Sequence, residues 1–409
     1  MTLFRWFLFA VFSLSGAIAT AADTPALRRI RQVLASGEQA VRIVCFGDSV
    51  TGVYYHSGGR SSYPEILAAS LKARHPHTDL AVLNAGISGH TTTNGLARLQ
   101  QDVLAHKPHL VTVMFGLNDV AKGTPELYRK NLVEIVQKCR AAGAEVILCT
   151  PNEVSETAAR PVARVAEIAE IARQVAAGLE VPLADPHADL GKLRQSDPAT
   201  WRLSMSDEIH PNLRGHRRLA EALLQVIEGE PVSLADGEAV SGALAFTLAR
   251  LRKGEGVKVL AMPPFDTLVA EGWRVRFPNA PISVVSWPVA GLSRPALMKD
   301  AANRVRPMAP NLVILAVPRS ATAKDREELI RTQAWIAANS LSRGKREWDV
   351  VVVHPSVFEG PGGKADSETD DLIRAIVPAQ DLSLLDRVPG DTREAGEIWR
   401  EWLASQSGE

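Results

Sequence analysis

From Val41 onward, short apolar runs rich in β-branched residues alternate with longer stretches whose apolar residues recur at helical spacing. The short runs predict buried strands and the longer stretches predict helices. In the first half of the chain, predicted strands cover residues 41–46, 80–84, 110–115 and 145–149, and predicted helices cover residues 64–74, 95–106, 128–140, 162–177 and 212–228. Because strands that are apolar along their whole length belong to parallel sheets covered on both faces, we predict an α/β fold. Ligands of such folds bind at the carboxyl ends of the strands.

The second half of the chain repeats this pattern. Residues 80–119 align without a gap on residues 282–321, and the segment between the two halves is rich in Gly, Pro, Ser and Asp. We therefore predict two copies of one domain, at residues 22–230 and 243–409, joined by a linker at residues 231–242. The alternative is a chance likeness between two α/β patterns.

The first 21 residues differ from the rest of the chain. A short basic start with Arg5 precedes an apolar run at residues 6–19, and residues 19–21 have the small-x-small spacing of a cleavage site. The run is shorter than the ~20 apolar residues that a membrane span needs. We predict that residues 1–21 are a cleaved signal peptide of an exported protein, periplasmic or extracellular, without stable membrane insertion. An uncleaved anchor helix is the alternative.

Charge and cysteine content exclude some classes of protein. The 46 basic residues match the 46 acidic ones, so the chain has no electrostatic reason to bind nucleic acid or an anionic membrane. The three cysteines, Cys45, Cys139 and Cys149, are odd in number and irregular in spacing. We expect buried free thiols rather than disulfides.

Four short blocks carry the candidate chemistry. Residues 47–49 (Gly-Asp-Ser), 84–89 (Asn-Ala-Gly-Ile-Ser-Gly) and 116–119 (Gly-Leu-Asn-Asp) each follow a predicted strand, and residues 207–212 (Asp-Glu-Ile-His-Pro-Asn) open the last predicted helix of the first half. Since the carboxyl ends of parallel strands meet at one edge of a sheet, we expect these blocks to lie together.

The first and fourth blocks fit a nucleophile and its base. The hydroxyl of Ser49 is a poor nucleophile until an imidazole takes its proton, and His210 can do this. Asp207, three residues earlier, could hold that ring in the required tautomer, and Asp185 or Asp189 are the alternatives. Taken alone, Ser49 could also be only a helix N-cap.

The second and third blocks fit an oxyanion hole. Acyl transfer needs preorganised donors for the tetrahedral intermediate, and losing one costs about 3–4 kcal/mol. The backbone N–H groups of Ser49 and Gly89 and the side-chain amide of Asn118 can supply them. A turn role for Asn118 is the alternative, and we expect Asp119 beside it to be structural.

The four blocks, in this order, resemble those of the SGNH hydrolases, also called GDSL esterases or lipases. The resemblance covers about residues 40–225. Within it, residues 81–123 are particularly similar to the thioesterase I/lysophospholipase L1 branch of the family. It implies a flavodoxin-like three-layer α/β/α fold with a parallel sheet, duplicated in this chain.

The resemblance also implies a role for each residue of the blocks. The nucleophile corresponds to Ser49 and the base to His210, with Asp207 as its partner. The oxyanion hole corresponds to Ser49, Gly89 and Asn118. No cofactor is implied, because no phosphate-binding glycine-rich loop is present. We expect no metal site either, since no Cys or carboxylate cluster completes the closely spaced histidine pairs at residues 75–77 and 106–109.

The second copy has lost these residues. In the alignment, Phe265 stands at the nucleophile position and Ser320 at the position of Asn118, and no histidine follows His354 to serve as base. We therefore expect residues 243–409 to be a degenerate, non-catalytic domain. Trp287 falls in the former oxyanion loop, where it is either a core residue or a platform for a sugar ring.

These features together predict a secreted serine ester hydrolase that acts through an acyl-enzyme. Its substrate is a small-molecule or polysaccharide ester, with an acetyl ester of a carbohydrate as the first candidate. A thioesterase or lysophospholipase activity is the alternative among enzymes. A glycan-binding or scaffold protein with vestigial catalysis is the alternative outside them, and the four intact blocks argue against it.

Overall fold

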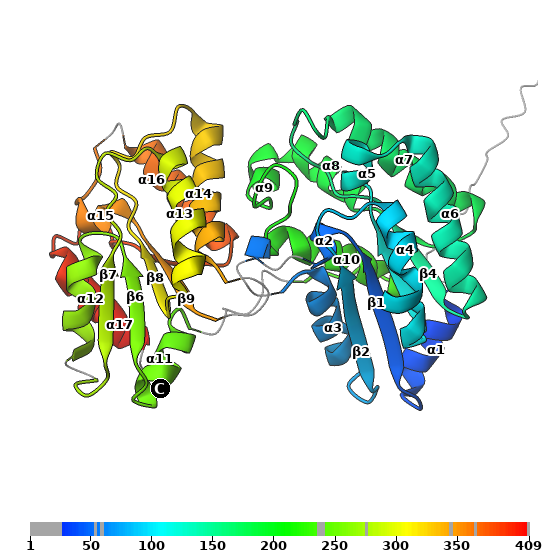
Figure 1. The fold of residues 1–409 in the computed structure, drawn as a ribbon, viewed down its shortest axis with the longest axis horizontal. Helices are drawn as coiled ribbons and strands as arrows, with labels where there is room; N and C mark the ends of the chain where they lie inside the picture. Colours follow the sequence, from blue (N-terminus) through cyan, green and yellow to red (C-terminus); the bar gives the residue numbers. More distant parts are fainter. Residues whose placement is uncertain are drawn as a thin grey trace, which may run out of the picture.

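A computed structural model describes residues 27–52, 55–57, 61–234, 242–274, 277–342, 347–363 and 366–406. The predicted signal peptide and most of the predicted linker lie outside these ranges. The described residues form two units that lie side by side, each built on one five-stranded sheet (Figure 1). Among them, no helix is both long enough and apolar enough to cross a membrane.

The first unit has the strand order β2-β1-β3-β4-β5, with every neighbouring pair parallel. The strands are β1 (Val41–Gly47), β2 (Leu80–Gly86), β3 (Leu110–Met114), β4 (Glu145–Cys149) and β5 (Leu183–Ala184). This is the flavodoxin-like order of doubly wound folds, and the predicted α/β class is confirmed.

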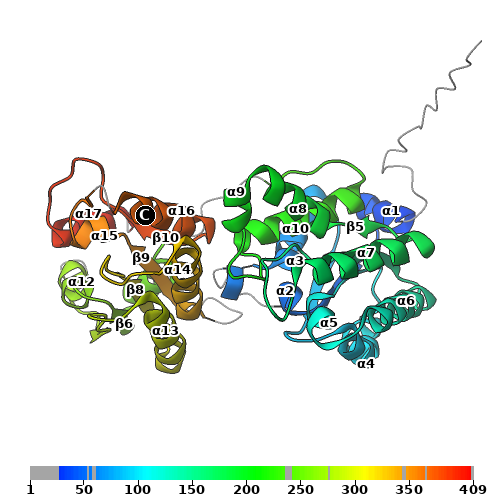
Figure 2. The ribbon, with the colours of Figure 1, turned by 90° about the horizontal axis from the view of Figure 1, so that it is seen from above.

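Helices cover both faces of this sheet because its central strands are apolar on both sides. On β1, Ile43 and Cys45 enter one core with α1, α3 and α10, while Val44 and Phe46 enter the other with α4, α6 and α7. Figure 2 shows α10 and α4 on opposite sides. The helices of this unit are α1 (Arg28–Ser36), α2 (Ser49–Gly52), α3 (Tyr63–Arg74), α4 (Thr92–Asp102), α5 (Leu117–Lys122), α6 (Pro125–Ala141), α7 (Val162–Gly178), α8 (Pro186–Ser196), α9 (Pro198–Arg202) and α10 (Leu213–Glu228), with single 3-10 turns η2 (Tyr55–Ser57) and η3 (Leu104–His106).

The second unit has the order β7-β6-β8-β9-β10, which is the same topology as in the first unit. Its strands are β6 (Val257–Ala261), β7 (Ile282–Ser286), β8 (Leu312–Leu315), β9 (Asp349–Val353) and β10 (Ser383–Leu385). Its helices are α11 (Ala245–Arg252), α12 (Phe265–Arg274), α13 (Arg294–Met308), α14 (Arg326–Ser340), α15 (Pro355–Phe358), α16 (Ser367–Ala379) and α17 (Ala395–Gln406).

Two polar interactions recur at equivalent places in the units. An acidic residue at the start of the fourth strand, Glu145 or Asp349, accepts two backbone N–H groups from the first turn of the unit's first helix. An arginine also pairs with the aspartate that follows the fifth strand, with Nε and Oδ2 2.7 Å apart in both units; the pairs are Arg173–Asp185 and Arg374–Asp386. The likeness of the halves therefore extends to individual side chains.

Trp287 is a core residue, which is the first of the two alternatives left open by the sequence. Its side chain is fully buried, and its Nε1 donates to Oδ2 of Asp300 at 2.7 Å.

The three cysteines are free and buried, as predicted. The helix predicted at residues 95–106 begins earlier, because Thr91 caps it at Asn94 N–H, and ends at Asp102, before the separate turn η3.

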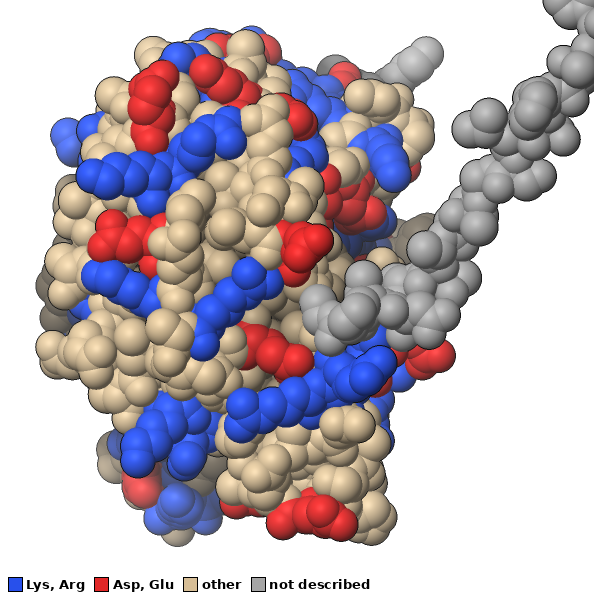
Figure 3. All heavy atoms as spheres, turned by 90° about the vertical axis from the view of Figure 1, so that its right-hand side faces the viewer, with Lys and Arg blue, Asp and Glu red and all other residues tan. Residues whose placement is uncertain are grey.

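On the outer face of the first unit, basic and acidic side chains lie intermixed (Figure 3). This arrangement agrees with the formal net charge of zero of the whole chain.

Candidate active site

Ser49 stands where β1 ends and α2 begins. The preceding turn is tight, since a Cβ on Gly47 would lie 2.5 Å from the carbonyl oxygen of Met114 on the neighbouring strand β3. Oδ1 of Asp48 accepts the backbone N–H of Val50 at 3.0 Å and so fixes the turn. The Ser49 side chain therefore lies at the carboxyl edge of the sheet, with 9% of the residue exposed.

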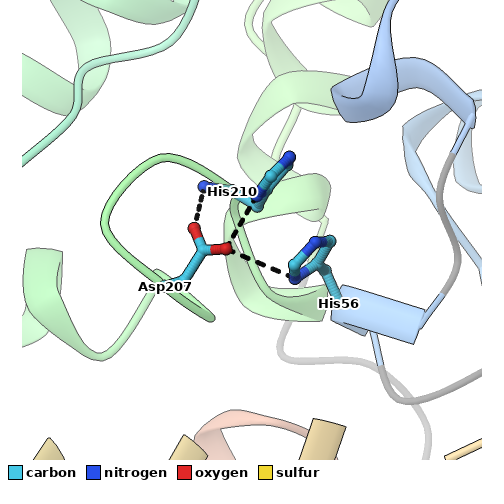
Figure 4. A group of neighbouring side chains, drawn as sticks. All are labelled: His56, Asp207 and His210. Carbon is cyan, nitrogen blue, oxygen red and sulfur yellow. Dashed lines mark hydrogen bonds and ion pairs between the residues drawn. The ribbon is translucent and has the colours of Figure 1, made fainter. Parts of the chain in front are cut away.

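The structure brings Ser49, His210 and Asp207 together. Oγ of Ser49 lies 2.9 Å from Nε2 of His210. Nδ1 of the same ring lies 2.8 Å from Oδ2 of Asp207, as Figure 4 shows. The other oxygen, Oδ1, accepts the backbone N–H of His210 at 2.6 Å. The carboxylate therefore holds both the ring and the backbone of the histidine, and Nε2 is left to accept a proton from the serine.

Asp207 is built to stay ionised. Burial raises the pKa of this carboxyl, but the adjacent His210 and the backbone N–H groups of the 207–210 turn outweigh burial and hold the pKa well below its usual range. The two other aspartates considered from the sequence are engaged elsewhere. Asp185 pairs with Arg173, and Asp189 lies 3.5 Å from Arg218.

The amide of Asn118 is oriented by an arginine. Nη2 of Arg160 donates to Oδ1 of Asn118 at 2.9 Å, while Nε donates to the carbonyl oxygen of Leu117. Nδ2 of Asn118 therefore faces the opposite way, donating to the carbonyl oxygen of His90 at 3.1 Å and lying 3.5 Å from Oδ2 of Asp48. The amide joins the nucleophile turn to the loop after β2. Arg160 was not recognised from the sequence, although its place after β4 is at the expected edge.

Gly89 lies in that loop with a φ of +78°, a conformation that side chains disfavour. Its carbonyl oxygen accepts a hydrogen bond from Nζ of Lys122 at 2.9 Å. The backbone N–H groups of Gly89 and Ser49 donate to no acceptor among the described residues. These two N–H groups are available to a substrate at the edge where the amide of Asn118 also lies.

Asp48 is the buried neighbour of the nucleophile, and its acidity is altered. Burial raises its pKa from 3.8 to about 6, although the N–H of Val50 and the nearby His210 act in the other direction. This carboxyl consequently ionises within the neutral range, in contrast to Asp207.

His56 is a site residue that sequence reasoning missed. Its ring lies parallel to that of His210, with centroids 3.9 Å apart and planes at 13°. Its Nδ1 lies 3.1 Å from Oγ of Ser206, and burial, together with the adjacent His210, lowers its pKa well below the usual range. A neutral imidazole thus covers one face of the base. A single histidine in the loop after the nucleophile has no sequence pattern that would identify it.

The second unit reaches this cluster through α14. The indole of Trp335 meets the ring of His56 edge-on, with centroids 5.9 Å apart and planes at 77°. The contact places a side chain from the second unit one ring away from His210. The two units therefore share the immediate surroundings of the site.

The cluster of His56, Asp207 and His210 has the residue types of a metal site, with ligand atoms within 4.8 Å of one another. Its geometry favours hydrogen bonding instead. Nδ1 of His210 already faces Oδ2 of Asp207 at 2.8 Å, and Nδ1 of His56 lies 3.1 Å from Oγ of Ser206.

A cleft of about 780 Å³ lies between the units, and Ser49, His56, Asp207 and His210 are not among the residues that line it. Glu208, the neighbour of Asp207, lines it and lies 3.5 Å from Arg331 of α14. Arg202 of α9 and Glu327 of α14 form a second ion pair across it at 3.1 Å. Most of the residues that line it are charged or polar.

One protein family matches residues of the first unit. The model of the GDSL-like lipase/acylhydrolase family matches residues 45–218. An acetylxylan esterase of Geobacillus stearothermophilus is 27% identical over 217 residues, which are 47% of this chain and 95% of that protein.

A thioesterase 1/protease 1/lysophospholipase L1 of Escherichia coli is 34% identical over 107 residues, which are 26% of this chain and 49% of that protein. Among solved structures, LAE5, an alpha/beta hydrolase enzyme from the metagenome of Lake Arreo, is 32% identical with a TM-score of 0.40. The match covers 47% of this chain and 97% of that one.

Proposed function

Since residues 45–218 are a domain of the GDSL-like lipase/acylhydrolase family and the protein is a carboxylic ester hydrolase, we propose that it acts through an acyl-enzyme on Ser49. The observation that carries the proposal is the continuous chain from Oγ of Ser49 through His210 to Asp207, with steps of 2.9 and 2.8 Å. A serine that is only a helix N-cap has no need of such a chain.

In the first half of the reaction, Oγ of Ser49 attacks the ester carbonyl carbon while its proton passes to Nε2 of His210. Asp207 stabilises the imidazolium. The tetrahedral intermediate collapses when the carbon–oxygen bond to the alcohol breaks, and the imidazolium gives its proton to the departing alcohol oxygen. In the second half, His210 takes a proton from water, the hydroxide attacks the acyl-enzyme, and Ser49 regains its proton as the carboxylic acid leaves.

The oxyanion of each intermediate is held by the N–H groups of Ser49 and Gly89 and by Nδ2 of Asn118. Preorganisation supports this assignment, because Arg160 fixes which end of the Asn118 amide faces the site before substrate arrives.

For the substrate, we propose a short acyl group, acetyl first, on a carbohydrate. Two observations support a hydrophilic alcohol portion. The acetylxylan esterase relative is matched over 95% of its length, and the residues that line the cleft between the units are mostly charged or polar. The alternative is a thioesterase or lysophospholipase activity, as named for the relative matched over 49% of its length.

The role of Ser49 is tested with Ser49→Ala in the full chain and p-nitrophenyl acetate as substrate. We expect the catalytic rate to fall about 1000-fold or more with an unchanged thermal transition. Ser36→Ala, an exposed serine at the end of α1 in the same unit, is the control and should keep full activity. A Ser49→Ala protein that keeps a tenth of the activity would exclude this serine as the nucleophile.

The substrate is tested with p-nitrophenyl esters of two to ten carbons, an acyl-coenzyme A thioester and acetylated xylan. We expect kcat/KM to fall as the acyl chain lengthens and acetate to be released from the polysaccharide. A maximum at long chains would favour the alternative.

We propose export through a cleaved signal peptide at residues 1–21. The support is the sequence pattern, and a relative from Bacillus subtilis is named an uncharacterized lipoprotein. N-terminal sequencing of the protein from the periplasm or medium tests it, and a first residue near position 22 is expected.

We propose that the second unit is a duplicated copy that has lost its chemistry. The shared strand order and the recurring Arg–Asp pairs support duplication. Phe265 at the nucleophile position is fully buried, and Ser320 replaces the oxyanion asparagine. Activity remaining in the Ser49→Ala protein that a serine-reactive phosphonate still removes would contradict this assignment.

A further inference from the structure

Arg294, the first residue of α13, is a buried cation of the second unit. The residue is 1% exposed, its Nη1 donates to Oε1 of Gln333 at 2.7 Å, and its Nη2 has no hydrogen-bond partner in the part of the chain that the structure describes. Burial lowers its pKa to about 10, and no carboxylate of the described residues forms an ion pair with it. A buried charge with an unused donor is costly, so a reason for its presence is needed.

The first unit handles the equivalent place differently. The ungapped alignment pairs Arg294 with Thr92 and Ala321 with Asp119. In the first unit, the Asp119 carboxylate accepts the backbone N–H of Thr92 at 3.0 Å and is buried. The second unit thus has a methyl group where the first has a carboxylate, and a guanidinium where the first has a hydroxyl. Compared with the first unit, the second unit therefore has the additional cation Arg294 and lacks the carboxylate that would lie at position 321.

Arg294 and Ala321 line a cavity of about 200 Å³ beside the first turns of α13 and α14. The other charged side chains that line it are Arg319, Arg326, Asp325 and Glu368. Arg326 and Glu368 are exposed, so the cavity reaches solvent while Arg294 lies buried.

The partners of these side chains limit what the cavity can hold. Arg319 is already paired with Asp370 at 2.8 Å, and Asp325 accepts the backbone N–H of Glu328 as the cap of α14. With Arg319 paired to Asp370, the charges that remain in the lining are those of Arg294, Arg326, Asp325 and Glu368, and Arg294 is the buried one among them. The volume lies below the ~300–1,000 Å³ of sites for drug-sized ligands. The small volume and the buried cation fit a small ligand with a single negative charge.

We propose that this cavity binds a small carboxylate, one oxygen of which accepts a hydrogen bond from Nη2 of Arg294. A guanidinium is the side chain best suited to a carboxylate, since its donors are planar and remain charged. The site is separate from Ser49, and the proposal stands whether or not the proposed substrate is correct. The unit that lacks the catalytic residues would then be a ligand-binding unit.

The test uses the full chain with sodium acetate as probe and sodium chloride at equal ionic strength as reference. Binding is followed by calorimetric titration and by the thermal transition. The unsubstituted protein should bind acetate saturably and melt at a higher temperature. Arg294→Met should weaken binding at least about tenfold, as expected for loss of a charged hydrogen-bond donor. Arg304→Met, on the exposed part of the same helix, is the matched control and should bind normally.

Ala321→Asp supplies an internal counter-charge and keeps the arginine. We expect this variant to be insensitive to acetate and at least as stable as the unsubstituted protein, because the buried cation then has a partner. This variant also tests whether acetate binds at Arg294 if the Arg294→Met protein does not fold. Acetate effects equal to those of chloride, or equal in the Arg294→Met and Arg304→Met proteins, would overturn the proposal. Saturable binding of phosphate but not of acetate would overturn its choice of ligand.

Discussion

Replacing Trp335 with alanine should slow the enzyme although the residue belongs to the second unit. Its indole meets His56 edge-on, and His56 covers one face of the base His210. Such an edge-to-face contact contributes about 0.5–1.5 kcal/mol. If all of it serves to hold the two imidazoles in place, the rate falls by about 2- to 10-fold at most.

The loss should appear in kcat for p-nitrophenyl acetate and leave KM unchanged, because orientation of the base matters after substrate has bound. Trp402→Ala is the matched control, since Trp402 is also a half-buried tryptophan of the second unit but stacks on Trp399 of the same helix. The rate of Ser49 labelling by an activated phosphonate gives a second readout that does not depend on the ester chosen.

A double-mutant cycle decides whether Trp335 acts through His56. His56→Ala should cost more than Trp335→Ala, because it also removes the stacked ring, and the double variant should be no slower than His56→Ala alone. His56→Phe, which keeps a ring against the base, should retain more activity than His56→Ala. Additive losses, or equal losses in the Trp335→Ala and Trp402→Ala proteins, would refute the reasoning.

Three further predictions concern the first unit. Asn118→Ala should lower kcat about 100-fold or more with little change in KM, and a change confined to KM would exclude the oxyanion role. Arg160→Met should lower kcat in the same direction by a smaller factor, measured on the same substrate, since the Asn118 amide is then free to turn. Asp48→Asn should stabilise the protein at pH 8. The pKa of Asp48 is about 6 in the folded state and 3.8 ordinarily, so ionisation of this carboxyl disfavours the folded state. The unsubstituted protein therefore loses up to about 3 kcal/mol of its free energy of unfolding as the pH rises from about 4 through 6. Urea unfolding at pH 4 and pH 8 measures this, and an equal effect at both values would contradict it.

The sequence was sufficient for the class of fold because apolar strands and amphipathic helices have different periods. The four longest strands of the first unit were predicted within a few residues, and so were five of its ten described α-helices, namely α3, α4, α6, α7 and α10. The two-residue strand β5 and the short helix α9 were not predicted, because elements of that length carry too few residues for a period to be recognised.

For the candidate site, the residues of the four blocks could be identified from the sequence, but the residues that hold them in place could not. Ser49, Asn118 and His210 lie in blocks whose order resembles a known family. His56 lies in the single turn η2 and Arg160 in a loop, and both act by contacts across at least 40 residues of sequence, as the 42 positions between Arg160 and Asn118 illustrate. Only the packing of loops, including one contact from the other unit, reveals them.

The hydrogen bond between Ser49 and His210 joins residues 161 positions apart. A chain that has folded only as far as β4 already holds the strand and turn of its serine but has no base to activate it, so such an intermediate cannot attack esters. Contacts between distant parts of a sequence form late, because a large loop must close first. The rate at which hydrolysis returns after dilution from urea therefore reports the last steps of folding. The circular dichroism of the helices reports the earlier steps.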